Sequence, residues 1–152
     1  MHRCRETFIG RLALISKRLD MLTSEVRAFL QKPRVARLAT IGTDGYPHVV
    51  PIYFMLDGDD IIFGSDRDNR KVRNVLSNRK GAVVIGGEPT VDEAGYMIQG
   101  DLSIEDDLDH IVTRRMLFRY ETKEEAEKNL AEWKNSDIVL IRLKPKSVTR
   151  VW

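Results

Sequence analysis

The stretch LATIGTDGYPHVVPIYFMLDGDDIIFGS, residues 38–65, alternates apolar and polar residues in runs that break twice at Asp-Gly. Alternation with a period of two is typical of strands that bury one face. Asp-Gly between two such runs is a strong hairpin signal. The spacing predicts strands at residues 35–41, 47–56 and 61–65, joined by tight turns at 43–46 and 57–59. Three strands joined this closely predict an antiparallel meander.

The remaining patterns complete a mainly β fold. Pro51 interrupts the second run, which predicts an edge strand or a bulge because proline donates no ladder hydrogen bond. Thr23 or Ser24 begins a predicted helix that ends near residue 30. Further strands are predicted at 81–87, 96–104, 137–143 and 147–152. Further helices are predicted at 69–78, after a cap at Asp106, and from Thr122 to near residue 133. A six-stranded antiparallel Greek-key barrel with flanking helices accommodates these elements most economically.

The composition argues against a disulfide-rich protein, a membrane protein and a metal-binding protein. The chain has 152 residues, a formal net charge of +2 and one cysteine, Cys4. One cysteine excludes an internal disulfide framework and favours a reducing, cytoplasmic location. No run approaches the length of a membrane span, so no membrane partner is expected. Three scattered histidines provide no metal-ligand spacing, so no metal site is predicted.

The chain divides into two parts. Residues 1–21 are basic and partly apolar, but Arg11 interrupts the apolar run and no small-residue cleavage site follows. We interpret them as an N-terminal extension without an assigned function. Residues 22–152 are predicted to form a single domain.

A basic cluster follows the third predicted strand. Residues 66–80 contain two aspartates and six cations: Arg67, Arg70, Lys71, Arg73, Arg79 and Lys80. The cluster lies at a strand-to-helix turn, where Ser65 and backbone N–H groups at the helix start can also meet an anion. One interpretation is a phosphate or carboxylate site, since arginine and lysine both suit such groups. The alternative is a solvated helix face.

His48 is the remaining candidate for chemistry. A strand histidine can act as a general acid or base near neutral pH. No carboxylate stands next to it in the sequence, and a lone histidine of this kind more often has a structural or hydrogen-bonding role. Acidic residues at 105–110 are explained by helix capping and the helix dipole.

The order of these elements resembles the pyridoxamine 5′-phosphate oxidase-like family of flavin- and deazaflavin-binding split β-barrels. The resemblance covers roughly residues 22–152. The matching segments are LAT (38–40), DGYPHVVPI (44–52), DGDDIIFGS (57–65), RKVRN (70–74) and the closing IRLKPKSVTRVW (141–152). No Lys or Arg occurs in residues 48–54 and no Arg-x-His site for a pyridoxine substrate is recognisable. The resemblance therefore does not extend to the oxidase's own substrate.

The resemblance implies a homodimeric oxidoreductase with FMN, or its deazaflavin analogue F-420, at sites in the subunit interface. Hydride would pass between the cofactor ring and a small organic substrate, with His48 as the candidate proton donor. Implied ring contacts are Thr40, His48, Val49, Val50 and Pro51. Implied phosphate contacts are Ser65, Asn69, Arg70, Lys71 and Arg73. We also expect Tyr53, Trp133 or Trp152 to reach across the dimer and cover the ring.

Two other classes stay open. One is a non-catalytic protein that binds or carries a flavin or haem. The other is a binder of nucleic acid or another polyanion, whose affinity would fall steeply with salt. No aromatic residues alternate with the cations of the basic cluster, which argues against a nucleic-acid partner.

Overall fold

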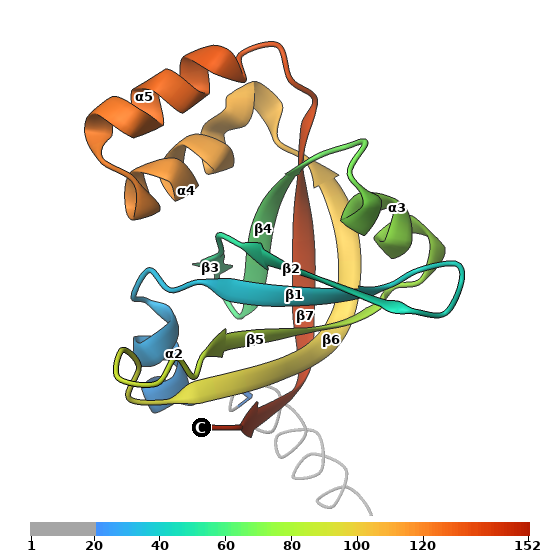
Figure 1. Cartoon of the computed structure of the whole chain (residues 1–152), viewed down its shortest axis with the longest axis vertical. Helices are drawn as coiled ribbons and strands as arrows, with labels where there is room; N and C mark the ends of the chain where they lie inside the picture. Colours follow the sequence, from blue (N-terminus) through green and yellow to red (C-terminus); the bar gives the residue numbers. More distant parts are fainter. Residues whose placement is uncertain (1–20) are drawn as a thin grey trace, which may run out of the picture.

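The structure is a computed structural model that describes residues 21–152 (Figure 1). The predicted extension at residues 1–21 lies, except for Met21, outside this range. The helices are α2 (Ser24–Leu30), α3 (Arg70–Ser77), the 3-10 turn η1 (Leu108–His110), α4 (Ile111–Tyr120) and α5 (Lys123–Glu132). The strands are β1 (Ala36–Ile41), β2 (Pro47–Ile52), β3 (Met55–Asp57), β4 (Asp60–Asp66), β5 (Lys80–Gly86), β6 (Gly95–Asp106) and β7 (Ile138–Arg150). No helix in residues 21–152 is long and apolar enough to cross a membrane.

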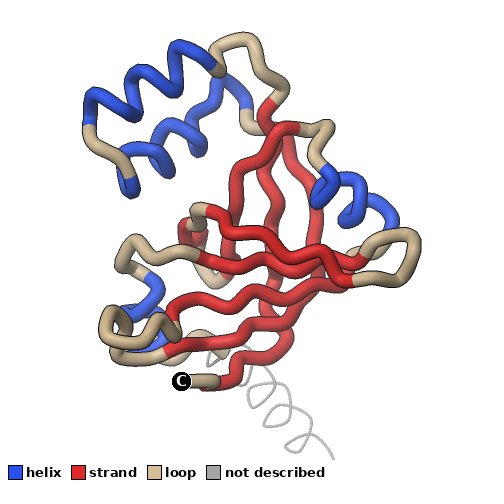
Figure 2. The backbone as a smooth tube through the Cα atoms, viewed as in Figure 1, coloured by secondary structure: helices blue, strands red, loops and turns tan. Residues whose placement is uncertain are grey.

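Within these residues, seven strands form one antiparallel sheet in the order β2-β1-β5-β6-β7-β4-β3. Strands β2 and β3 are the two edges of this sheet, yet only Tyr53 and Phe54 separate them in the chain. Three residue steps span at most about 11 Å, so the sheet must curl until its edges approach. Figure 2 shows the strands wrapping in this way. The predicted split barrel is therefore confirmed, with one strand more than expected.

The predicted meander is wrong. Residues 47–56 form two short strands instead of one, because the chain leaves the β1 edge at Tyr53 and joins β4 at Met55. The expectation for Pro51 is confirmed, since β2 pairs with β1 alone. At the other end of the chain, the two predicted late strands are one strand, β7. Pro145 lies in it opposite Gly100, where the β6–β7 register shifts at a bulge.

The core lies inside the curled sheet. Fully buried side chains come from β1, β4, β5, β6, β7 and α3, with α2 closing one end: Leu30, Leu38, Phe63, Val72, Val83, Ile98 and Ile141. Phe54, in the link between β2 and β3, is also fully buried and anchors the crossing. Helix α3 buries Val72 and Val75, as its predicted helical spacing requires.

The hairpin of helices α4 and α5 projects beside the barrel (Figure 1). Thr122 and Glu125 form the predicted capping box of α5. The predicted cap at Asp106 is wrong: the neighbouring Asp107 accepts hydrogen bonds from the backbone N–H groups of Val112 and Thr113. Asp106 instead pairs with Arg67 at the surface. Successive side chains along an extended chain point in opposite directions, so only the buried Asp107 reaches the helix.

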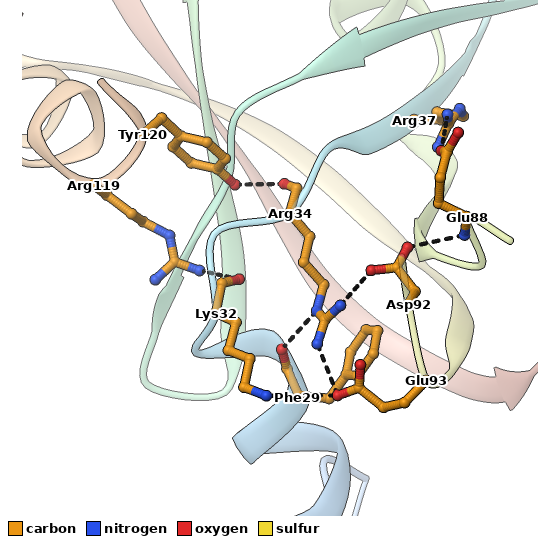
Figure 3. Close-up of polar contacts among 9 residues, drawn as sticks. All are labelled: Phe29, Lys32, Arg34, Arg37, Glu88, Asp92, Glu93, Arg119 and Tyr120. Atoms are coloured by element: carbon orange, nitrogen blue, oxygen red, sulfur yellow. Dashed lines mark hydrogen bonds and ion pairs between the residues drawn. The ribbon is translucent and has the colours of Figure 1, made fainter. Parts of the chain in front are cut away.

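The end of α4 is tied to the segment that precedes β1 (Figure 3). Tyr120 donates its hydroxyl hydrogen to the carbonyl of Arg34 at 2.7 Å and accepts the N–H of Phe54 at 3.2 Å. Arg119 donates to the carbonyls of Leu30 and Lys32 at the end of α2. These bonds satisfy carbonyls that a helix terminus leaves free. They also fix the crossing between the two sheet edges.

Candidate functional site

A cavity of about 440 Å³ lies between the β2–β3 crossing, the end of β4, the start of α3 and the α4 helix. This volume is within the range of about 300–1,000 Å³ typical of cofactor and small-molecule sites. Four of the predicted cofactor contacts line it. They are Pro51, Ser65, Asn69 and Lys71.

The polar end of the cavity is built where β4 passes into α3. Ser65 is 7% exposed, donates its hydroxyl hydrogen to the carbonyl of Asp66 at 3.0 Å, and accepts the Asn69 amide at 3.2 Å. Asn69 is the N-cap residue of α3, but its side chain makes no capping bond. The N–H of Val72 donates to the carbonyl of Asn69, so it is the first two N–H groups of α3, those of Arg70 and Lys71, that keep the capacity to meet an anion.

Lys71 supplies the positive charge at this end, which the carboxylate-bearing Asp66 also lines. It is half-buried, and no ion pair joins it to a carboxylate within residues 21–152. Burial lowers its pKa, and the charge of nearby Asp66 opposes that shift. A buried cation without a bound partner is costly, so an anionic ligand would stabilise the charged form of Lys71.

The rest of the cavity is apolar and has a floor and a rim. Met116 and Leu117 of α4 form the floor and are 4% and 3% exposed. At the rim, Val35, Tyr53 and Trp133 are 48%, 37% and 36% exposed. The cavity thus has a charged end beside α3 and an apolar body that opens to solvent.

The rest of the basic cluster is largely engaged elsewhere. Arg67 pairs with Asp106 and Asp137, and Lys80 pairs with Asp101. The remaining two predicted phosphate contacts, Arg70 and Arg73, are exposed on α3 and do not line the cavity. Arg70 lies 3.6 Å from Asp44 of the β1–β2 turn, and Arg73 donates to the carbonyl of Asp68. Of the six cations, Lys71 alone lines the cavity.

The other predicted ring contacts lie next to the cavity residues but not in its lining. Thr40 is buried, and its hydroxyl accepts the amide of Asn74 at 3.0 Å. His48 pairs with Thr40 across the β1–β2 ladder. His48 and Val50 are half-buried on one face of β2, whereas Val49 is exposed on the other face, with Pro51.

His48 carries one unusual feature. Its Nδ1 atom is buried and has no hydrogen-bond partner among the described residues. Such atoms are uncommon in folded proteins. The proton-donor role of His48 stays a prediction.

Sequence reasoning missed the contribution of α4. Thr113, Met116 and Leu117 share one face of that helix and line the cavity, as do Val35 and Ile138. The i, i+3, i+4 spacing of the three α4 residues marks a packed face. The spacing alone does not indicate that this face packs beside β4 and lines a ligand cavity instead of joining the core. Two of the three predicted cover residues, Tyr53 and Trp133, line the cavity, whereas Trp152 does not.

Comparison with known proteins gives the family. The family model described as pyridoxamine 5′-phosphate oxidase matches residues 22–152. A curated reductase from Streptomyces rimosus, named 5a,11a-dehydrotetracycline/5a,11a-dehydrooxytetracycline reductase, is 38% identical over 74 residues. That match covers 46% of this chain and 52% of the relative, so the chain spans about half the length of the curated relative it matches.

Solved structures share the fold. An F420 reductase superposes with a TM-score of 0.65 at 22% identity, covering 81% of this chain and 94% of the other. The General Stress Protein 26 from Bacillus anthracis superposes with a TM-score of 0.63 at 21% identity, covering 85% and 92%. At these identities the likeness concerns the fold alone.

Proposed function

The chain belongs to the pyridoxamine 5′-phosphate oxidase family, and from that membership we propose that it is an oxidoreductase that binds FMN or the deazaflavin F-420. The reaction is hydride transfer between the cofactor ring and a small organic substrate. One observation carries the proposal: half-buried Lys71, with no ion-pair partner in residues 21–152, stands with Ser65 and Asn69 at one end of an apolar cavity. The curated reductase that matches part of the chain supports the reaction class.

The residues of the cavity fit such a cofactor. Both candidates join a flat tricyclic ring to a phosphate, so each needs an anion site next to an apolar slot. Lys71 and the start of α3 suit the phosphate, with Ser65 and Asn69 as hydrogen-bonding groups. Pro51 and the floor of Met116 and Leu117 suit the ring.

In this proposal, Lys71 neutralises the phosphate and Asn69 orients it. When bound, the cofactor supplies the hydride chemistry, and the protein contributes position and electrostatics. Backbone groups near Val50, on edge strand β2, would hold the ring edge. The apolar floor excludes water from the reacting face. Arg70 and Arg73, exposed on α3, act on the phosphate from outside the cavity.

We also propose a homodimer with the two cofactor sites at the subunit interface, where the second copy packs against strand β2 beside the cavity. Edge strand β2 supports this arrangement, because Pro47, Val49 and Pro51 are exposed along one of its faces. Unpaired edges that carry apolar residues favour association. Sedimentation of the purified protein would give its mass directly, and a monomer at micromolar concentration would contradict the dimer.

A direct titration tests the function. Cofactor-stripped protein is titrated with FMN and with F-420 side by side, following quenching of tryptophan fluorescence. Trp133 at the cavity rim should report the binding. Binding of one cofactor identifies the redox partner, whereas binding of neither refutes the proposal. Reduction of the bound cofactor followed by substrate-dependent reoxidation would separate an enzyme from a flavin carrier, and a parallel haem titration tests the haem carrier.

Substitution of Lys71 tests the phosphate site. Lys71→Ala should weaken binding by about 1.5–3 kcal/mol, the scale of a hydrogen bond to a charged group. That loss corresponds to a dissociation constant roughly 10- to 150-fold larger. The matched control is Lys128→Ala on the exposed face of α5, which should leave the dissociation constant unchanged. An unchanged constant in Lys71→Ala would refute the phosphate assignment.

A further inference from the structure

The rim of the cavity is an exposed apolar surface that the cofactor residues do not use. Val35, Tyr53 and Trp133 come from three different segments of the chain and line the same opening. Grouped exposed hydrophobic side chains in soluble proteins commonly mark a binding surface. Two of these three are aromatic, and aromatic rings present flat faces to a ligand.

Tyr53 is held rigidly at this rim. Its ring stacks on that of Tyr120, with centroids 4.1 Å apart and an interplanar angle of 7°. Tyr120 is itself fixed by its hydroxyl, which donates to the carbonyl of Arg34 (Figure 3) and accepts the N–H of Phe54. One face of Tyr53 is thus covered by Tyr120, and Tyr53 also lines the cavity.

The hydroxyl of Tyr53 remains a hydrogen-bond donor at neutral pH. Burial and the neighbouring carboxylate of Glu121 both raise its pKa above the ordinary value of 10.0. Glu121 is held in turn by the Asn129 amide at 2.8 Å. The rim therefore offers a flat aromatic wall together with a neutral polar group.

We propose that this rim is the substrate subsite and that it selects planar, conjugated, uncharged organic molecules. Tyr53 is the specificity-determining residue, because its ring provides the wall against which a flat molecule packs. Tyr120 is a positioning residue that holds Tyr53 in that orientation. The inference rests on the proposed function, since the substrate lies over a cofactor ring bound on the floor beneath.

Two neutral probes with the same carbon skeleton test the selectivity. Calorimetric titrations of the cofactor-loaded protein use planar 2-naphthol and its saturated analogue decahydro-2-naphthol. Favourable aromatic pairs are worth roughly 0.5–1.5 kcal/mol beyond area burial, so 2-naphthol should bind about 2- to 13-fold more tightly. Equal affinity for the two probes would overturn the proposal.

Variants separate specificity from folding. Tyr53→Leu, measured in protein kept saturated with cofactor, should abolish the preference for 2-naphthol. Tyr120→Leu should reduce the preference, and Tyr120→Phe, which keeps the stacked ring, should restore most of it. Tyr46→Leu is the matched control, because Tyr46 lies 72% exposed in the β1–β2 turn outside the cavity. A retained preference in Tyr53→Leu would also overturn the proposal.

The outcomes distinguish the two proposals. Wild-type protein that takes up neither FMN nor F-420 overturns both. Protein that loads a cofactor but binds the two probes equally overturns the substrate subsite alone. A purely structural role for Tyr120 predicts that Tyr120→Leu weakens cofactor and both probes together, and that result would refute the positioning role.

Discussion

Replacement of Asp107 with alanine should destabilise the protein far more than replacement of its neighbour Asp106. Asp107 is 6% exposed, and its carboxylate accepts three hydrogen bonds, from the N–H groups of Val112 and Thr113 and from the hydroxyl of Thr113. Those distances are 3.0, 2.8 and 2.6 Å. Asp106 makes a solvent-exposed ion pair with Arg67.

The magnitude follows from these contacts. Loss of a helix cap costs about 0.5–2 kcal/mol, and a hydrogen bond to a charged group contributes about 1.5–3 kcal/mol. Because the contributions overlap, Asp107→Ala should lower the free energy of unfolding by about 2–4 kcal/mol. Asp106→Ala should lower it by about 0–1 kcal/mol, the range for exposed ion pairs. Near this chain length, one kcal/mol shifts Tm by about 2–4 °C.

The assay is urea and thermal denaturation of both variants and of the wild type, followed by circular dichroism. Asp107→Ala should also weaken cofactor binding, because Thr113 lines the cavity and its helix would lose its start. Equal losses of stability in the two variants would refute the role of the Asp107 carboxylate as the acceptor for the first-turn N–H groups of α4. A larger loss in Asp106→Ala would restore the cap predicted from the sequence.

Three further predictions concern Lys71, Thr40 and Gly100. Burial lowers the pKa of Lys71, so cofactor affinity should fall as pH rises through that lowered pKa, and Lys71→Arg should flatten the fall in a titration series. In cofactor-free protein the pH dependence of the free energy of unfolding has the opposite sign. The unfolded chain holds the Lys71 proton more tightly than the folded one, so the contribution of Lys71 to stability rises with pH up to about 10.4. Thr40→Val leaves the buried Asn74 amide without its acceptor and should cost about 1–3 kcal/mol in urea denaturation; no loss would mean that the Thr40–Asn74 bond contributes nothing. Gly100→Ala places a Cβ against the carbonyl of Lys144 at the β6–β7 bulge and should lower the free energy of unfolding by at least about 2 kcal/mol. Gly58→Ala is the comparison, because its Cβ would meet no atom within 4 Å. Its φ of +62° should still cost about 1 kcal/mol.

Local signals in the sequence were sufficient for most elements. Alternation predicted β1 and β4 to within one residue, and the capping box of α5 follows directly from the spacing of Thr122 and Glu125. Pro51 correctly indicated an edge strand. These features depend on neighbours in the chain, so a window of residues contains the information.

The candidate site was predicted in part for the same reason. Ser65, Asn69 and Lys71 lie together in a strand-to-helix turn, so their proximity can be read from the sequence. The six cations of residues 66–80 could not be ranked in this way. Arg67 is paired with Asp137, seventy positions away, whereas Lys71 turns into the cavity, and both outcomes depend on contacts between distant segments.

By itself, then, the sequence determined most of the strands and helices, the resemblance to a family and the position of the strand-to-helix turn that carries Ser65, Asn69 and Lys71. Only the tertiary structure decided that the chain crosses from one sheet edge to the other at Tyr53, that α4 forms the cavity floor, and that Tyr120 stacks on Tyr53. The physical reason is the distance along the chain over which each interaction acts. Periodicity and capping act over a few residues, whereas closure of a curled sheet depends on the packing of the whole core, which no local pattern encodes.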